Sequence, residues 1–143
     1  MTIEQVRPGD RAAAEALLRR ANLPLDGIDE HFGHFIVARG GDGALVGLAG
    51  IELYGASALI RSVVVAPSHR RTGLGHRLMD AIIARAKSAG VGTLYLLTEG
   101  ARPFFEAMGF EAIERADVDP HVASSSQFRS APCRAATCLR RTI

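Results

Sequence analysis

The sequence is short of cysteine, of aromatic residues and of net charge, and it has no long apolar run. Seventeen Lys and Arg stand against 15 Asp and Glu, and the basic residues are scattered in pairs, so no nucleic-acid partner is expected. No stretch approaches the ~20 uninterrupted apolar residues of a membrane helix, so no membrane partner is expected either. The N-terminal residues lack the charged-then-apolar pattern of an export signal, and we expect a cytoplasmic protein.

The two cysteines, Cys133 and Cys138, both lie near the C-terminal end of the sequence. A zinc site needs four ligands, and this Cys-x4-Cys spacing has no second pair beside it, so no metal site is expected. His31 and His34 likewise have no third ligand nearby and are expected at a pocket rim or on the surface. We expect free thiols, with a thiol site for a metalloid as the alternative.

Turn residues and apolar periodicity divide the sequence into strands and helices, and its length fits one domain over residues 1–143. Asp10 is placed to cap the first helix, and Gly90 to end the long one. Strands are expected at 2–7, 34–39, 44–54, 58–66, 93–98, 110–116 and 136–142, and helices at 11–21, 74–89 and 101–108, with a helical turn or loop at 25–33 and a further helix near 120–129.

The strongest functional signal is a basic, glycine-containing loop between an apolar strand and a helix, Val65-Ala66-Pro67-Ser68-His69-Arg70-Arg71-Thr72-Gly73-Leu74-Gly75. The unpartnered backbone N–H groups and the dipole at the start of a helix attract an anion. The glycines let a phosphate approach the main chain, and the two arginines add positive charge. A Gly-Lys-Ser/Thr sequence is missing and the glycine order is not Gly-x-Gly-x-x-Gly, so we expect a pyrophosphate site that is neither a P-loop nor a dinucleotide fingerprint.

The spacing Val-x-Pro-x-x-Arg-x-x-Gly-x-Gly resembles the acetyl-CoA pyrophosphate loop of the GNAT superfamily of N-acetyltransferases. Residues 101–110, which end in Gly-Phe, are similar to a later helix of the same family. The resemblance covers nearly the whole chain and implies an α/β GNAT fold. In this fold a mixed, mostly antiparallel sheet of six to seven strands is flanked by helices and splayed between strands 4 and 5. It also implies acetyl-CoA as cosubstrate, with the pantetheine arm in the gap and no metal.

The resemblance further implies which residues hold the cosubstrate. The backbone N–H of Val63 would polarise the thioester carbonyl as an oxyanion-hole donor. Phe105 stands where most relatives have a tyrosine that is thought to protonate the departing thiolate, so water would protonate this thiol, whose pKa is about 8.5. Thr98 stands where many relatives have asparagine. The expected cofactor-binding residues are Val63, Val64, Val65, Arg70, Arg71, Thr72, Gly73, Leu74, Gly75, His76, Thr98, Phe104 and Phe105.

The acceptor side is expected around the third and fourth strands. Glu52 is the only carboxylate in the apolar run 45–53, so it is the candidate general base, with a solvated strand face as the alternative. Tyr54 shares its strand face and is a candidate for acceptor binding and a weak substitute acid. Arg61 is a candidate carboxylate clamp or, alternatively, a member of an ordinary ion pair. Ser62 would face away from Arg61 unless the strand has a bulge.

Local features such as Gly50-Ile51-Glu52-Leu53-Tyr54-Gly55 are similar to the small acetyltransferases of arsenic-resistance operons and, more distantly, to the acetyltransferase domain of N-acetylglutamate synthases. This resemblance implies a small amino-acid-like amine acceptor, glutamate-like or an arsenic-containing analogue. No cysteine is expected near the basic loop or the separating strands to form an acyl-enzyme, so we expect direct attack within a ternary complex. The alternatives are a protein or peptide N-acetyltransferase, a non-catalytic acyl-CoA sensor and a thiol-based metalloid module. A homodimer is left open.

Overall fold

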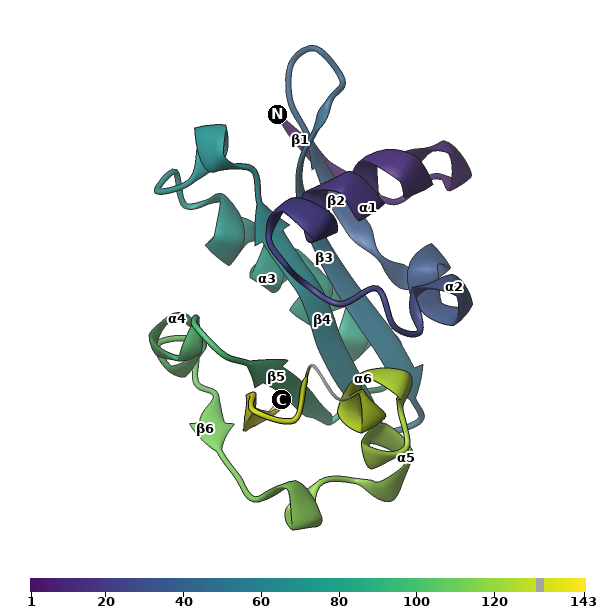
Figure 1. The fold of residues 1–143 in the computed structure, drawn as a ribbon, viewed down its shortest axis with the longest axis vertical. Coiled ribbons are helices and arrows are strands. Elements are labelled where there is room, and N and C mark those ends of the chain that lie inside the picture. Colours follow the sequence, from purple (N-terminus) through teal and green to yellow (C-terminus); the bar gives the residue numbers. More distant parts are fainter. Residues whose placement is uncertain (131–132) are drawn as a thin grey trace.

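The computed structural model describes residues 1–130 and 133–143 as one seven-stranded sheet with helices on both faces (Figure 1). The strand order is β1-β2-β3-β4-β5-β7-β6. The strands are β1 (Thr2–Gln5), β2 (Ile36–Arg39), β3 (Leu45–Tyr54), β4 (Ser57–Val65), β5 (Thr93–Thr98), β6 (Glu111–Ala112) and β7 (Thr137–Thr142). The helices are α1 (Arg11–Arg20), α2 (Ile28–His31), α3 (Leu74–Ser88), α4 (Arg102–Glu106), α5 (Pro120–Ala123) and α6 (Ser126–Arg129).

All neighbouring strands are antiparallel except β4 and β5, which run parallel. These two strands pair only from Ser57 with Thr93 to Leu59 with Tyr95, although both continue well beyond this point. Their C-terminal parts therefore separate. The pairing confirms the predicted mixed, mostly antiparallel sheet that is splayed between its fourth and fifth strands.

A β-bulge in β4 lies at the start of this separation. Leu48 of β3 is opposite Val64, whereas Gly50 is opposite Arg61, so two residues of β4 face the single residue between them on β3. Ser62, the first of the two, has a left-handed backbone with φ +59°. Because a bulge bends its strand and shifts the alternation of side chains, the rest of β4 is re-aimed relative to β5.

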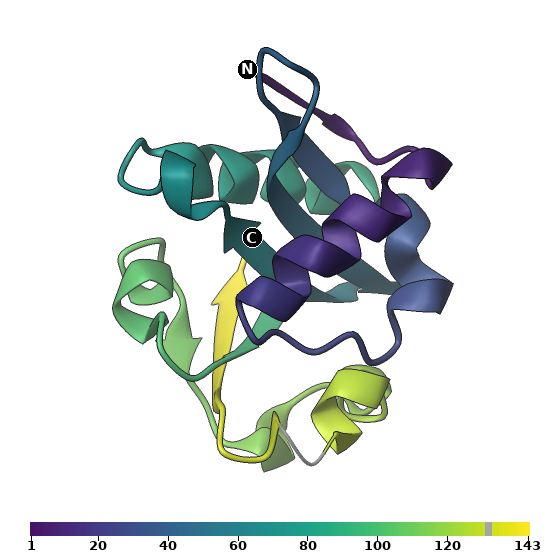
Figure 2. The same cartoon turned by 45° about the horizontal axis from the view of Figure 1, so that its top comes forward.

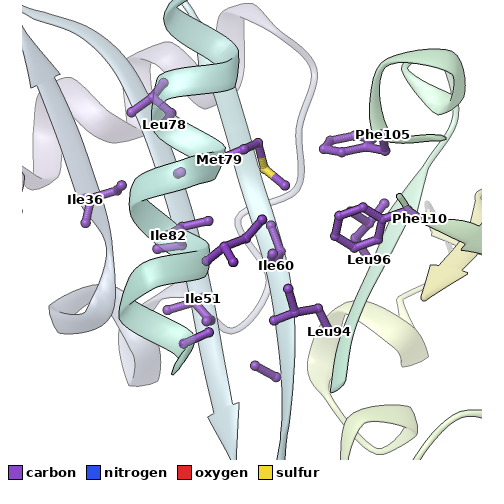
Figure 3. Packing of buried hydrophobic residues seen from close by; sticks show 14 of the residues in the cluster. Ile36, Ile51, Ile60, Leu78, Met79, Ile82, Leu94, Leu96, Phe105 and Phe110 are labelled. Atoms are coloured by element: carbon purple, nitrogen blue, oxygen red, sulfur yellow. The ribbon is translucent and has the colours of Figure 1, made fainter. Parts of the chain in front are cut away.

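The two faces of the sheet carry separate cores, because successive strand residues point to opposite sides. In β2, Ile36 packs in the core under α3, whereas Val37 packs in the core under α1 and α2. Figure 2 shows α1 lying across one face of the sheet while α3 covers the other. The apolar stripe of α3 meets strand residues and the aromatic rings of the α4 region (Figure 3); its buried residues are Leu74, Leu78, Met79, Ile82, Ile83 and Ala86.

The C-terminal third differs most from the sequence prediction. The strand predicted at 110–116 is only the two-residue β6, followed by a 3-10 turn at Arg115–Asp117. The helix predicted near 120–129 is divided into α5 and α6, because Ser125 adopts an extended backbone and its Oγ accepts the N–H of Phe128 as an N-cap. None of the helices in the described part of the chain is long and apolar enough to cross a membrane.

Asp10 occupies the predicted position before α1, but its carboxylate does not cap that helix. It accepts hydrogen bonds from the Arg7 backbone and from the guanidinium of Arg39, the latter at 2.9 and 2.6 Å. These contacts tie the start of α1 to β2 and lower the pKa of Asp10, chiefly through the bond from Arg39.

Candidate active site

A cavity of about 720 Å³ lies where β4 and β5 separate. Its walls come from both strands, from the chain that follows β5, from the segment after α1 and from the C-terminal region. The lining residues are Ala21–Pro24, Asp26, Ile60–Val65, Arg70, Leu96–Ala101, Phe105, Gln127, Cys133 and Ala136. Both Arg61 and Ser62 line it, which a regular strand would not permit and the bulge does.

The basic loop joins the end of β4 to the start of α3 beside this cavity. A 3-10 turn at Pro67–His69 is followed by Arg71 and Gly73, which have left-handed φ values of +63° and +81°. Gly73 is the N-cap of α3, and the first intrahelical bond runs from the Arg77 N–H to its carbonyl. The N–H groups of the preceding helical residues have no intrahelical acceptor, so the exposed start of this 15-residue helix is suited to an anion.

A row of aromatic rings connects the start of α3 to the cavity. His76 contacts Phe104 edge to face, with ring centroids 4.9 Å apart, and Phe104 contacts Phe105 in the same way at 5.0 Å. A side chain at Gly75 would place Cβ only 3.3 Å from the Phe104 ring, so glycine allows this close approach. Phe105 is buried and lines the cavity but has no proton to donate, and Thr98 accepts the backbone N–H of Ala101.

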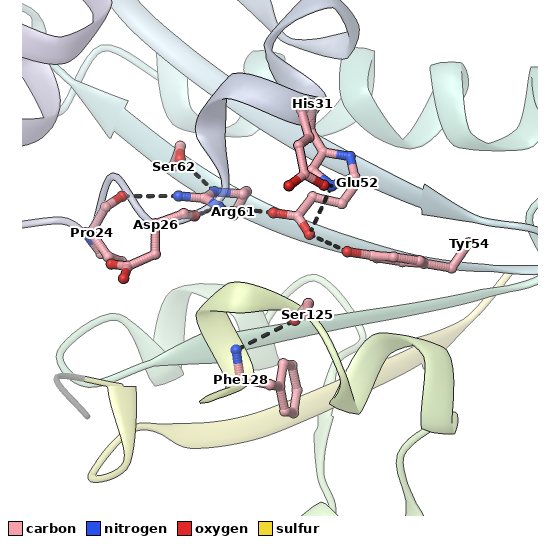
Figure 4. Close-up of polar contacts among 10 residues, drawn as sticks. Pro24, Asp26, His31, Glu52, Tyr54, Arg61, Ser62, Ser125 and Phe128 are labelled. Atoms are coloured by element: carbon pink, nitrogen blue, oxygen red, sulfur yellow. Dashed lines mark hydrogen bonds and ion pairs between the residues drawn. The ribbon is translucent and has the colours of Figure 1, made fainter. Parts of the chain in front are cut away.

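Glu52 and Arg61 form a buried ion pair (Figure 4), with the Arg61 Nη1 2.8 Å from a Glu52 oxygen. Their side chains are 1% and 0% exposed. Arg61 lines the cavity, whereas Glu52 does not. The structure therefore brings these two predicted site residues together, but they bind each other and do not face each other across the cavity.

The other oxygen of Glu52 is also occupied. It accepts the hydroxyl of Tyr54 and lies 3.5 Å from Nε2 of His31. Burial, and secondarily the bond to Glu52, raise the pKa of Tyr54, which makes this phenol a poorer proton donor. Tyr54 does not line the cavity. This placement does not favour its predicted role in acceptor binding or as a substitute acid.

Three parts of the cavity wall were not predicted from the sequence: the segment 22–26, Gln127 and Cys133. Gln127 is 5% exposed, and its Oε1 has no hydrogen-bond partner among the described residues. Cys133 is buried in this wall, so the expectation that no cysteine lies near the separating strands was wrong, but burial raises the pKa of its thiol and so disfavours the nucleophilic thiolate. No sequence signal places these residues at the cavity, because they reach it only through the packing of distant segments.

The two cysteines are free and line different cavities, since Cys138 faces a second hollow beside β6. His31 lies against Glu52, and His34 contacts Arg85 on α3. Within residues 1–130 and 133–143, no group of three or more His, Cys, Asp or Glu side chains could hold a metal ion.

Residues 5–110 match the family model described as the acetyltransferase (GNAT) family, and the chain belongs to this family. Mycothiol acetyltransferase from Stackebrandtia nassauensis is 32% identical over 104 residues, which are 71% of this chain and 34% of the relative. Amino-acid acetyltransferase from Pasteurella multocida is 32% identical over 79 residues, or 54% of this chain and 18% of the relative. The chain thus matches about a third or less of the length of these curated relatives.

Solved structures show the same fold. N-acetylglutamate synthase from Neisseria gonorrhoeae, complexed with coenzyme A and N-acetyl-glutamate, has a TM-score of 0.85 and 23% identity over 99% of this chain and 34% of its own. Rv2747 from Mycobacterium tuberculosis, complexed with CoA and NLQ, has a TM-score of 0.82 and 20% identity over 100% of this chain and 99% of its own. At this identity the likeness establishes the fold, as the resemblance predicted.

Proposed function

We propose that the chain is an acetyl-CoA-dependent N-acetyltransferase for a small, amino-acid-like amine. The observation that carries this proposal is a cavity between separating strands, beside a basic loop and helix start, with Arg70 of the loop in its lining. A long, flexible cosubstrate with a pyrophosphate fits that combination, because the helix start suits the anion and the gap suits the arm. The relatives named mycothiol acetyltransferase and amino-acid acetyltransferase, and the neighbours solved with coenzyme A, support it.

In this proposal, different parts of the site bind different parts of acetyl-CoA. The amides of residues 71–76 bind the pyrophosphate, assisted by the charges of Arg70 and Arg71. The backbone of Val63, Val64 and Val65 binds the pantetheine arm. The N–H of Val63 donates to the thioester oxygen, where negative charge develops during attack. The remaining proposed contacts come from Thr98 and from the rings of Phe104 and Phe105.

Acetyl-CoA supplies an acyl group that is activated as a thioester. The acceptor amine forms the new C–N bond within a ternary complex, the C–S bond breaks, and CoA leaves as a thiol. Phe105 cannot donate a proton, so water protonates the thiolate. Glu52 as the base that receives the amine proton stays a prediction, and its burial away from the cavity favours a supporting role instead.

The test is CoA release from acetyl-CoA, followed with a thiol reagent and by mass spectrometry of the product. The acceptor panel contains free amino acids, glutamate analogues, an arsenic-containing amino-acid analogue and short peptides with free N-termini. We expect acetylation of a small amine that also bears an acidic group. Acetylation of peptides only would overturn the small-molecule assignment.

A non-catalytic acyl-CoA sensor is the second candidate, and Phe105 at the position of the family's tyrosine is the observation that favours it. Calorimetric titration with acetyl-CoA separates the two functions. Binding without turnover of any amine or peptide in the panel would indicate the sensor. Turnover would exclude the sensor.

A homodimer stays a possibility left open by the sequence, which sedimentation analysis would test.

A further inference from the structure

The guanidinium of Arg61 is almost fully used by the protein itself. Arginine has five N–H donors, and four of them are engaged here. Nε donates to Ser62 Oγ at 3.1 Å and Nη2 donates to the Pro24 carbonyl at 2.9 Å, while Nη1 donates to Glu52 and to the Asp26 carbonyl. A bidentate clamp on a ligand carboxylate needs two parallel free donors, and only one N–H has no partner among residues 1–130 and 133–143.

The two carbonyls belong to the segment 22–26, which forms one wall of the cavity. Within the described structure, the backbone of this segment has few other anchors. The N–H groups of Asn22 and Leu23 bond to the end of α1, and beyond them the next backbone bond is the one that Ile28 donates to the Leu25 carbonyl, so the carbonyls of Pro24 and Asp26 are held by Arg61. A Cβ at Gly27 would lie 3.5 Å from Arg61 Nη1, so the chain passes directly over the guanidinium. Figure 4 shows Arg61 between Pro24 and Asp26 on one side and Glu52 on the other.

Glu52 makes this arrangement possible by neutralising a fully buried guanidinium. A buried charge without a partner is strongly destabilising, whereas a paired and hydrogen-bonded charge is tolerated. Tyr54 donates to Glu52, and His31 from α2 lies beside it, with Glu30 4.0 Å from His31. The carboxylate is thereby held in place to support Arg61.

We propose that Arg61 and Glu52 are positioning residues that shape the acceptor end of the cavity by holding the wall segment 22–26 in place. The effect of the pair on acceptor binding rests on the proposed acetyltransferase function, whereas its role in holding the wall segment does not. Arg61 acts on the acceptor through the Pro24 and Asp26 carbonyls, and Glu52 acts through Arg61. Acetyl-CoA binding, at the other end of the cavity, depends on the loop before α3 and is independent of the pair.

The structural part is tested by amide hydrogen exchange in the free protein. Arg61→Lys is expected to accelerate exchange in the peptide covering 22–28, because a lysine cannot reach both carbonyls and Glu52 together. Arg39→Lys is the matched control, since Arg39 also forms a largely buried pair, with Asp10, but lies outside the cavity lining. It is expected to leave exchange at 22–28 unchanged. If Arg61→Lys does not fold, Glu52→Gln, which keeps the size and an acceptor oxygen, carries the same test.

The functional part is tested with the amino acid that the wild-type protein acetylates and with the carboxamide of the same compound. Arg61→Lys is expected to raise the KM of both acceptors by a similar factor, about tenfold, while the KM of acetyl-CoA stays unchanged. Glu52→Gln should raise the acceptor KM in the same way and keep the pH profile of kcat. Arg39→Lys should change neither KM.

Three results would overturn the inference. Unchanged exchange at 22–28 in Arg61→Lys would show that the pair does not hold the wall. A loss confined to the carboxylate acceptor would make Arg61 a direct clamp, and a changed pH profile of kcat in Glu52→Gln would make Glu52 the base. If the wild-type protein acetylates nothing in the panel, the proposed function fails, while the exchange experiment still decides the role of the pair.

Discussion

Gly73 is the residue at which the proposed anion site begins. It begins α3 with φ +81°, a conformation that costs a residue with a side chain about 1 kcal/mol. Gly73→Ala is therefore expected to lower the free energy of unfolding by about that amount and to weaken CoA binding, because the first helical amides shift. Urea unfolding and calorimetric CoA titration measure the two effects.

Gly9→Ala is the control for this substitution, since Gly9 has no left-handed φ and a Cβ there meets no atom within 4 Å. It should leave CoA affinity unchanged. Equal CoA affinity in Gly73→Ala and the wild-type protein would remove the start of α3 from the binding site.

Residue-level chemistry was only partly predictable from the sequence. The sequence singles out an isolated carboxylate in an apolar strand and a nearby arginine as acceptor residues, with an ordinary ion pair as the alternative for Arg61, but it does not pair the two with each other. The hairpin register contains the missing information. Tyr54 pairs with Ser57, so Glu52 lies opposite Leu59 and diagonal to Arg61, a distance that long side chains span.

At the scale of elements, β3 has glycine where an aromatic ring crosses it. A Cβ at Gly50 would lie 2.5 Å from Phe35, whose side chain is fully buried between β3 and α1. Gly50→Ala is expected to lower the free energy of unfolding by about 1–3 kcal/mol, because the ring cannot move without disturbing the core. Chemical denaturation measures the change.

Gly41→Ala provides the comparison, because nothing lies within 4 Å of a Cβ at that turn position. Its free energy of unfolding should stay within about 0.5 kcal/mol of the wild-type value. A similarly small change in Gly50→Ala would mean that β3 and Phe35 are not packed as tightly as the structure shows.

Long elements with clear periodicity were predictable, whereas short ones were not. The strand 93–98 has the predicted bounds, and α3 ends one residue before the predicted limit. Both elements contain many apolar residues that recur in a pattern typical of one type of secondary structure, so their burial determines the element. The two-residue β6 and the division between α5 and α6 depend instead on pairing with β7 and on the Ser125 cap. The pairing of β6 with β7 joins segments that are distant in the sequence, whereas the Ser125 cap is local but ends a helix that apolar periodicity alone continues.

At the scale of the whole molecule, stability is expected to fall in mildly acidic solution. Burial, and then the positive charge of Arg85, lower the pKa of His34, whose Nδ1 lies 3.2 Å from that guanidinium. Stability from the neutral ring is complete above the unfolded pKa of about 6.5 and is lost as the pH falls from there toward the folded pKa. Urea unfolding between about pH 5 and pH 8 measures this loss.

His34→Gln removes the titrating group and is expected to flatten the pH dependence of stability over this range. The amide oxygen of Gln can still accept from Arg85, so the variant keeps the contact. An identical pH slope in the variant and the wild-type protein would contradict the assignment to His34.

The candidate site is built from one continuous segment and from segments that are distant in the sequence, and only the continuous part can be predicted from the sequence. The basic loop and its helix are one continuous segment, so the sequence alone predicts that a loop with two arginines leads into the start of a helix. The opposite wall joins the segment after α1 to Gln127 and Cys133 near the C-terminal end. Those parts meet only in the folded sheet, so they could not be predicted.

The most direct measurement is a crystal structure of the protein with CoA, supported by a titration in solution. We expect the pyrophosphate oxygens within hydrogen-bond distance of the amides of residues 71–76 and the pantetheine arm between β4 and β5. CoA bound elsewhere, or no binding in the titration, would contradict the proposed cosubstrate site and with it the acetyltransferase mechanism.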